Sequence, residues 1–343
     1  MSLVVAELRR LAKRRFAQVM AALVLLLMAV VIVTAAATHY KPGGAALARA
    51  EAEAAAAYAD QQAWMERDIQ ECERYWQSGQ QDPFVGWPED CEEIRQWQPS
   101  QEEMVQWFMP PAFEFRTAFP EMNFLLAGLL ALFAFVVGAS FVGAEWRSGG
   151  MTNLLLWRPR RLEVFGAKLA ALLGVVSGLT VLLSALWTGA FWLVATYRGI
   201  TDTMTSGVWQ SIGLAELRGL AMVLAAGTAG FALASLGRHT AMAMGVAIGA
   251  FVVGVGGVAT VAGGMLQVQF WEAWLWPTYI RAWMESSVTL FDWSAPCESF
   301  GTNGECIVPS MEISWQVAGV GIAGALVLML AAAMWHMRQR DVT

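Results

Sequence analysis

The sequence predicts an all-α polytopic membrane protein with six transmembrane helices, and three observations support this fold class. The chain of 343 residues is 57% hydrophobic and 15% charged, far from the roughly 25% charged residues of an average soluble domain. Six apolar runs approach or exceed the roughly 20 helical residues that cross a hydrocarbon core of about 30 Å. Basic residues cluster in alternate connectors between these runs, as the positive-inside rule expects for one side of a membrane.

The apolar runs are expected to be helices because backbone groups in lipid must bond to one another. In chain order they are Ala17–Thr38, Asn123–Ala144, Ala167–Thr196, Leu217–Leu236, Ala241–Met265 and Ile313–Met337. Residues 198–219 are polar and are predicted to form an outer connector. No charged residue or histidine lies at the centre of any run, which disfavours a proton antiporter. Gly245 and Gly249 form a GxxxG pattern that permits close helix approach.

The basic segments predict that both termini face the cytoplasm. These segments are residues 1–16, the connector 145–166 with Lys168, Arg238 and the tail 338–343. All of them fall on one side if there are six spans. Small residues at 35–37 leave a cleaved signal peptide as an alternative for the first span, although its apolar core is long for one.

Residues 39–121 are expected to form an acidic helical lobe outside the cell. Between residues 41 and 121 there are 16 acidic and 6 basic residues, a balance of −10 that leaves +4 for the rest of the chain. Residues 45–77 have a helical composition, and Ser100 with Glu103 forms a capping box that begins a second helix ending near Met109. The lobe is either a solvated stalk or a lid over a substrate vestibule.

All four cysteines fall on the outer side of this topology. Thiols restricted to an oxidising face suggest disulfides. Proximity in the sequence favours Cys72–Cys91 and Cys297–Cys306, although four cysteines allow three pairings. Metal ligation is the alternative, and the spacing is unlike that of a zinc knuckle, with His39 the sole outer histidine. No metal site is therefore expected.

The outer segment 266–312 is rich in tryptophan, which prefers the headgroup level of a membrane. It is expected to lie in the outer leaflet, or to dip back into it, as short helices broken at Pro277. Its tryptophans are either interfacial anchors or an outer gate that contacts amphipathic cargo. The residues assigned to this gate are Trp271, Trp274, Trp276 and Trp283.

The chain lacks the motifs of an enzyme. Gly166-Ala167-Lys168-Leu169 has neither the upstream glycine nor the hydroxyl residue of a phosphate-binding loop. There is no H-E-x-x-H and no G-x-S-x-G. We therefore expect no catalytic residue, no cofactor in this chain and no ATP hydrolysis by it.

The connector 145–166 is patterned unlike a simple loop. Gly149 and Gly150 allow the chain to leave the second span at a sharp angle. Met151–Trp157 is about two helical turns of mostly apolar residues, and Arg158 before Pro159 is a natural stop. An apolar patch flanked by arginines has the composition of a docking surface. The alternative is a loop whose arginines only fix the topology.

These features resemble the permease subunits of bacterial ABC exporters of the type-2 permease family, which share the type V exporter fold. The resemblance covers the topology of the whole chain: a basic N-terminal interfacial helix, six spans, an inner connector after the second span and a re-entrant outer segment before the sixth. The matching connector residues are Glu145, Gly149, Gly150, Thr152, Leu154–Leu156, Pro159, Arg160 and Lys168. The large lobe between spans one and two departs from the family pattern and leaves the cargo open.

The resemblance implies that the connector is a coupling helix seated in a separate nucleotide-binding (ATPase) subunit, which binds ATP and Mg. The residues assigned to this contact are Glu145, Arg147, Met151, Leu154, Leu155, Trp157, Arg158, Arg160 and Arg161. Glu145 is expected to pair with one of the connector arginines. The N-terminal helix, with Val4, Leu8 and Leu11 on one face, would touch the ATPase or bind anionic lipid.

The resemblance also implies a location in the inner (plasma) membrane of a bacterium, a second permease copy or paralogue, and contact with membrane lipids. No nucleic acid is expected as a partner. The cargo would be amphipathic or lipid-like: a drug, a peptide antibiotic or a lipid. A different class of function is a membrane-anchored sensor or structural protein whose lobe binds an extracellular partner. An intramembrane enzyme is disfavoured by the missing nucleophile.

Overall fold

The computed structural model describes residues 3–41, 43–78, 87–88, 90–97, 99–109, 112–157, 160–292, 295, 299–300 and 306–339. Helix dominates this part of the chain, and six helices are long and apolar enough to cross a membrane. The architecture is consistent with an all-α polytopic membrane protein. By contact, the chain divides into two compact units: Met1–Ile32, Arg116–Phe191 and Thr203–Thr343 form the first, and Val33–Phe115 with Trp192–Asp202 form the second.

The six long helices coincide with the six predicted spans. They are α2 (Arg15–Thr38), α5 (Phe115–Arg147), α7 (Arg161–Arg198), α8 (Ser206–Gly237), α9 (Thr240–Phe251) continued by π-helical turns at Val252–Gly257 and Ala259–Met265, and α11 (Trp315–Gln339). The apolar run therefore marks the middle of each helix. Its ends were less well predicted, because a spanning helix can continue through polar residues beyond the hydrocarbon core.

One prediction about α8 was wrong. The helix begins at Ser206, where the Thr205 hydroxyl accepts a hydrogen bond from the Val208 amide, so residues 206–219 are not a connector. Ionisable side chains also lie within the long helices: the Glu216 carboxylate in α8 accepts a hydrogen bond from Thr188 Oγ1 of α7 at 2.5 Å. Glu216 lies inside the helix but one residue before the predicted apolar run 217–236.

Helices α5 and α8 approach each other closely at glycines. A Cβ on Gly138 would meet the Gly227 carbonyl, and a Cβ on Gly230 would meet the Phe135 carbonyl. Small residues of this kind let two helix backbones touch. The GxxxG pattern of α9 does not serve this purpose among the described residues, since nothing lies within 4 Å of a Cβ built on Gly245 or Gly249.

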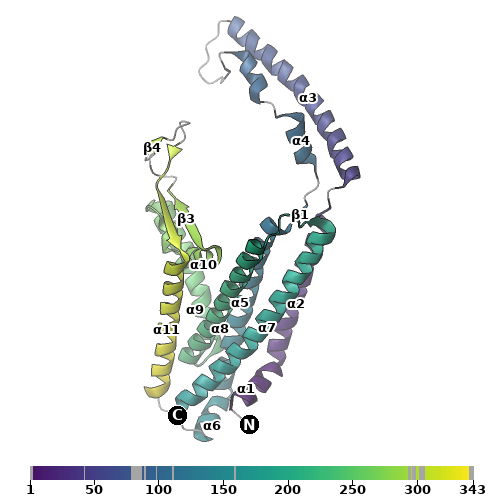
Figure 1. Cartoon of the computed structure of the whole chain (residues 1–343). Helices are drawn as coiled ribbons and strands as arrows, with labels where there is room; N and C mark the ends of the chain where they lie inside the picture. Colours follow the sequence, from purple (N-terminus) through teal and green to yellow (C-terminus); the bar gives the residue numbers. More distant parts are fainter. Residues whose placement is uncertain are drawn as a thin grey trace. The chain divides into compact units, whose positions relative to one another are not determined.

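The predicted basic segments meet at one end of the first unit, which we call the basic end. Helix α1 (Leu3–Ala12), helix α6 (Gly150–Trp157) and the C-terminal end of α11 lie there (Figure 1). Arg161 Nη1 donates a hydrogen bond to the Met337 carbonyl at 3.3 Å, and the Arg238 guanidinium lies 4.7 Å from the Trp146 ring centroid. The common end is thus a structural fact, whereas the side of the membrane that it faces stays a prediction.

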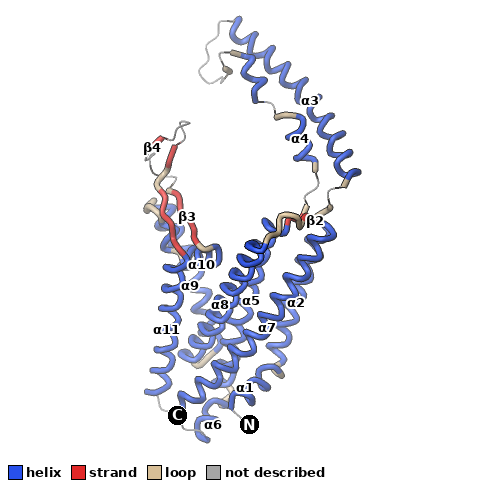
Figure 2. The backbone as a smooth tube through the Cα atoms, in the orientation of Figure 1, coloured by secondary structure: helices blue, strands red, loops and turns tan. Residues whose placement is uncertain are grey.

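The tryptophan-rich segment has more structure than predicted. A 3₁₀ turn (Trp271–Trp274) precedes α10 (Trp276–Glu285), and Pro277 lies in the first turn of α10, where it begins the helix instead of breaking it. Strands β3 (Ser287–Phe291) and β6 (Ser310–Ser314) then form an antiparallel pair, and β4 (Ser299–Phe300) pairs with β5 (Cys306–Ile307); both pairs are red in Figure 2. The sequence did not predict these strands. Helix α10 and the β3–β6 pair share a small core of Ala282, Val288, Leu290, Ile313 and Ala318.

The second unit confirms the local predictions for the lobe. Helix α3 (Gly44–Gln77) has the predicted extent, and the capping box of Ser100 and Glu103 begins α4 (Gln101–Phe108). A disulfide joins Cys72 of α3 to Cys91 at the start of a 3₁₀ helix (Cys91–Trp97). The unit also contains a parallel pair of two-residue strands, β1 (Phe113–Glu114) and β2 (Gly199–Ile200). The predicted Cys297–Cys306 bond lies outside the described residues.

Candidate functional site

A cluster of four charged side chains holds three elements together at the basic end. Lys168 Nζ of α7 lies 2.9 Å from Glu7 Oε2 of α1 and 2.6 Å from Glu145 Oε2 of α5. Arg14 Nη2, from the turn between α1 and α2, donates to Glu145 Oε1 at 2.7 Å. Two carboxylates and two cations therefore alternate across a junction that joins α1, α5 and α7.

Much of the cluster is buried, so the stability of this end depends strongly on the pairing of its charges. Lys168 is fully buried and Glu7 is 1% exposed. Removing charges from water costs several kcal/mol per ion unless each is paired and hydrogen-bonded. The buried Phe141 ring lies beneath both cations, with its centroid 5.0 Å from Arg14 Cζ and 5.0 Å from Lys168 Nζ. The aromatic face adds an attraction for the cations.

Helix α1 supplies its part of the cluster from a face that the sequence analysis assigned to the membrane interface. Leu11 is 1% exposed, and Leu8 lies 3.7 Å from a Cβ built on Gly174 of α7. Glu7 belongs to the same face, since residues three and four apart are neighbours on a helix. This face packs on α7, and the position of α1 at the membrane interface stays a prediction.

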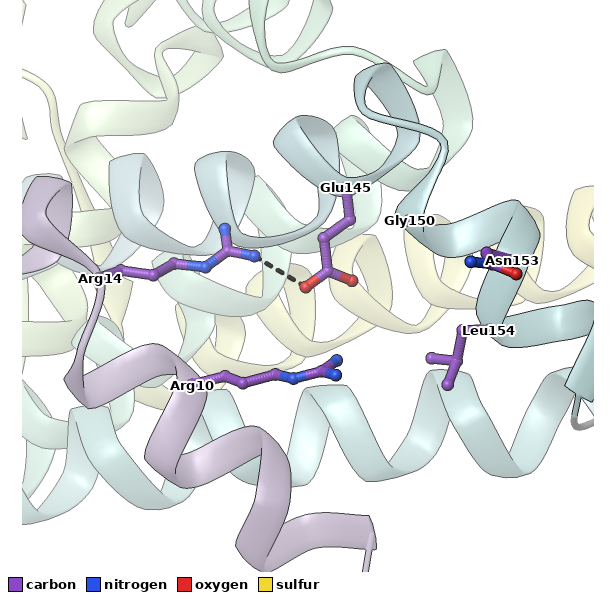
Figure 3. A pocket seen from close by; sticks show the side chains of 6 residues that line it. All are labelled: Arg10, Arg14, Glu145, Gly150, Asn153 and Leu154. Carbon is purple, nitrogen blue, oxygen red and sulfur yellow. Dashed lines mark hydrogen bonds and ion pairs between the residues drawn. The ribbon is translucent and has the colours of Figure 1, made fainter.

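A cleft of about 590 Å³ opens beside the cluster, between α1, the end of α5 and α6. Figure 3 shows Arg10 and Arg14 extending toward Glu145 on one side, with Asn153 and Leu154 of α6 facing them across the opening. Gly150 completes the lining. The chain turns sharply before α6 at Gly149, whose φ of 71° lies in the left-handed region that favours glycine. The cleft thus combines two guanidinium groups, a paired carboxylate, an amide and an apolar side chain.

The predicted coupling residues lie in different environments. Glu145 pairs with Arg14 and Lys168. Its expected pairing with a connector arginine stays a prediction, since Arg158 lies outside the described residues. Arg160 pairs instead with Glu163 at 2.9 Å, and Arg161 contacts Met337. Those arginines lie beyond the end of α6 and therefore meet the first turn of α7 and the end of α11.

The apolar residues of α6 divide into anchors and exposed groups. Met151 is 1% exposed, so it fixes α6 to the rest of the unit. Leu154 is half-buried and lines the cleft, and Arg147 is exposed at the end of α5. Leu156, which was not among the predicted contacts, is 74% exposed. The side chains of Leu155 and Trp157, and all of Arg158, lie outside the described residues.

Four residues that build this site were not predicted from the sequence: Glu7, Arg10, Arg14 and Asn153. One signal was available for Glu7, because a carboxylate on the apolar face of an amphipathic helix requires a buried cation. Its partner Lys168 is 161 residues away in the sequence. Only the fold brings the two together.

The four predicted gate tryptophans do not form one surface. Trp274 is 65% and Trp276 44% exposed, as interfacial anchors would be. Trp271 packs against Gly263, and Trp283 donates from Nε1 to the Arg218 carbonyl at 3.0 Å. The gate therefore stays a prediction.

The chain matches no protein-family model, no curated protein and no solved structure in comparisons with known proteins.

Proposed function

We propose that this chain is the membrane permease subunit of an ATP-binding cassette exporter, which moves an amphipathic or lipid-like cargo out of a bacterial cell. A separate ATPase subunit would bind ATP and Mg and dock at the basic end, which would face the cytoplasm. The observation that carries the proposal is the cleft between α1 and α6, which presents arginines and an apolar side chain beside a short connector helix. Arginine next to apolar groups is the composition of an interface centre.

The charge cluster gives the proposed docking site a mechanical connection to the spanning helices. A force on α6 passes to α5 through the short turn at Ser148 and Gly149, and to the buried contacts of Met151. Glu145 and Lys168 join α5 to α7, and Glu7 joins α1 to both. Movement of the ATPase would therefore displace three elements together, opening a path between this subunit and a second permease copy or paralogue.

Truncating the docking surface tests the proposal. The Leu154→Ala/Trp157→Ala variant, co-expressed with the ATPase encoded beside the permease gene, should lose about thirtyfold in ATPase affinity, since truncating buried anchors costs about 2 kcal/mol. Membrane insertion should be unchanged. Binding is measured by titrating labelled ATPase onto purified permease in detergent, and the permease alone should hydrolyse no ATP.

Leu328→Ala is the matched control, because Leu328 is an apolar side chain, 71% exposed, on α11. It should recruit the ATPase normally. Normal recruitment and export by the double variant would show that the connector is only a topological anchor.

A second candidate is a membrane-anchored sensor or structural protein whose lobe binds a partner. It is favoured by the division of the chain, which gives the lobe its own contact unit with a disulfide. Replacing residues 46–108 with a short Gly-Ser linker separates the two functions. An exporter subunit should still bind its ATPase after this deletion, whereas a sensor would lose its only ligand-binding part.

A further inference from the structure

A second cavity lies at the opposite end of α5 from Glu145. It encloses about 580 Å³ between the N-terminal parts of α5 and α8 and the C-terminal end of α10. Cavities of this size hold drug-sized ligands. Three charged residues line it, one from each element: Glu121, Arg218 and Glu285.

The three charges differ in how they are neutralised. The Glu285 carboxylate pairs with Arg281 on the next turn of α10, at 3.4 Å. Glu121 is exposed and forms no ion pair with any residue that the structure describes. Its carboxylate is therefore open to a cation that enters the cavity.

Arg218 is held in place without being neutralised. Its Nη1 donates to Ser286 Oγ at 2.7 Å, and its guanidinium lies 5.5 Å from the Trp315 ring centroid. Both partners are uncharged, and no carboxylate of the described chain lies within ion-pair distance of Arg218. The guanidinium is thus fixed at the cavity wall with its charge available to an anionic group.

Asn123 adds a polar group to the cavity wall. The residue is 4% exposed, and its amide atoms are not among the fully buried polar atoms that lack a partner in the described part of the chain. The amide can donate a hydrogen bond to a ligand in the cavity. Phe119, Phe124 and Met284 supply apolar walls around it.

We propose that this cavity binds a zwitterionic amphiphile, with its ammonium group at Glu121, its anionic group at Arg218 and Asn123, and its apolar body against Phe119, Phe124 and Met284. Separate, unneutralised charges of opposite sign on two walls match a ligand that carries both. The source is either a lipid headgroup of the phosphatidylethanolamine type or a soluble molecule such as a peptide with free ends. The proposal names the cargo class of the proposed exporter and rests on that function for transport, while binding requires this chain alone.

Ligand binding to the purified chain in dodecyl maltoside tests the proposal without the ATPase. The probes are lysophosphatidylethanolamine for the lipid source and trileucine with free termini for the soluble source. Lysophosphatidylglycerol and dodecylammonium, which carry one charge each, are the ligand controls. Binding is measured by thermophoresis, and at least one zwitterion should bind more tightly than both single-charge controls.

Variants of the cavity charges give the deciding measurement. Glu121→Gln should weaken binding of that zwitterion about fivefold, the size expected for a solvent-accessible ion pair. Arg218→Gln should weaken it about tenfold, because its hydrogen bond to a charged group is held in fixed geometry. Glu285→Gln is the matched control inside the cavity, and it should change affinity less than twofold, since Arg281 already neutralises Glu285.

Binding by only one of the two zwitterions identifies the source. Binding of neither, or a zwitterion affinity that both Glu121→Gln and Arg218→Gln leave unchanged, overturns the proposal. Should Arg218→Gln fail to fold, Glu121→Gln decides alone, because its side chain is exposed. Failure here leaves ATPase recruitment by the basic end intact, so the two proposals fail separately.

Discussion

The two ends of α5 each carry a glutamate, and the two glutamates lie in opposite electrostatic environments. Glu145 contacts two cations, and its side chain is 13% exposed. Glu121 is exposed and contacts no cation among the described residues. One helix thus uses the same residue type in two ways: a neutralised carboxylate holds helices together, and an unneutralised one leaves a charge available to a ligand.

The stability of the basic end should therefore depend on its charges far more than the stability of the Glu121 end of α5 does. Breaking a buried ion pair by removing one partner costs about 3–5 kcal/mol, whereas an exposed group contributes less than about 1 kcal/mol.

Lys168→Met should have the largest effect. Among the described residues it leaves the buried Glu7 carboxylate with the exposed Arg10 alone, at 3.3 Å, and it should cost about 3–5 kcal/mol of stability. Thermal unfolding of the purified chain in detergent measures the loss.

Two controls accompany this variant. Adding Glu7→Leu should recover much of the loss, because Glu145 keeps Arg14. Arg160→Ala, which breaks an exposed pair, should cost less than about 1 kcal/mol. A Lys168→Met protein as stable as the parent would mean that the cluster does not hold the helices.

Removing the disulfide with Cys72→Ala/Cys91→Ala should have an effect of about 3 kcal/mol, confined to the second unit. The bond closes a loop of 19 positions, which gives that value in the chain-entropy model. Limited proteolysis should cut within α3 and α4 sooner, while the unfolding of the spanning helices stays the same.

Mass spectrometry of a non-reduced digest checks the pairing itself. It also tests the predicted Cys297–Cys306 bond. Free thiols in the native protein would contradict both assignments.

A change at Glu103 should have the smallest effect on stability. It distinguishes the effect of a carboxylate's exposure from the effect of its hydrogen bonds. It is exposed like Glu121, but the backbone amide of Ser100 donates to its carboxylate at 2.7 Å, and the Ser100 hydroxyl donates at 2.9 Å. These hydrogen bonds, the backbone one foremost, lower the pKa of Glu103 below its ordinary value of 4.5. Because the folded pKa is the lower one, the stabilisation of α4 is complete above the unfolded pKa and is lost as pH falls through the folded pKa.

Hydrogen exchange at the first turn of α4 should therefore speed up below about pH 4.5 relative to the middle of α3. Glu103→Gln should remove most of this pH dependence, and Glu102→Gln should keep it. Identical pH profiles for the two variants would show that the cap does not depend on the charge.

Local chemistry was predictable from the sequence, whereas most of the site was not. The cap at Ser100, helix α3 and the Cys72–Cys91 bond depend on residues within about 20 positions of one another, and each was predicted. The middle of each spanning helix followed from hydropathy. The cluster of Glu7 and Lys168 required the packing of α1 on α7, which no local pattern encodes.

The missed strands and helix starts have a similar cause. Strands β3 and β6 pair across nearly 20 intervening positions. Each alternates polar and apolar residues, but over five residues or fewer and within a segment whose tryptophans favoured an interfacial helix. Helix α8 starts with polar residues whose helical state depends on the Thr205 cap and on packing against neighbouring helices. Hydropathy alone places such residues outside the span.

Helix α5 carries both proposed sites without a break, from Glu121 to Glu145, a rise of about 36 Å at 1.5 Å per residue. A rotation or axial shift at one end therefore reaches the other end. If the two proposed ligands favour different positions of this helix, thermodynamic linkage makes their effects equal: the factor by which the docked ATPase changes the affinity for the zwitterion is the factor by which the zwitterion changes the affinity for the ATPase.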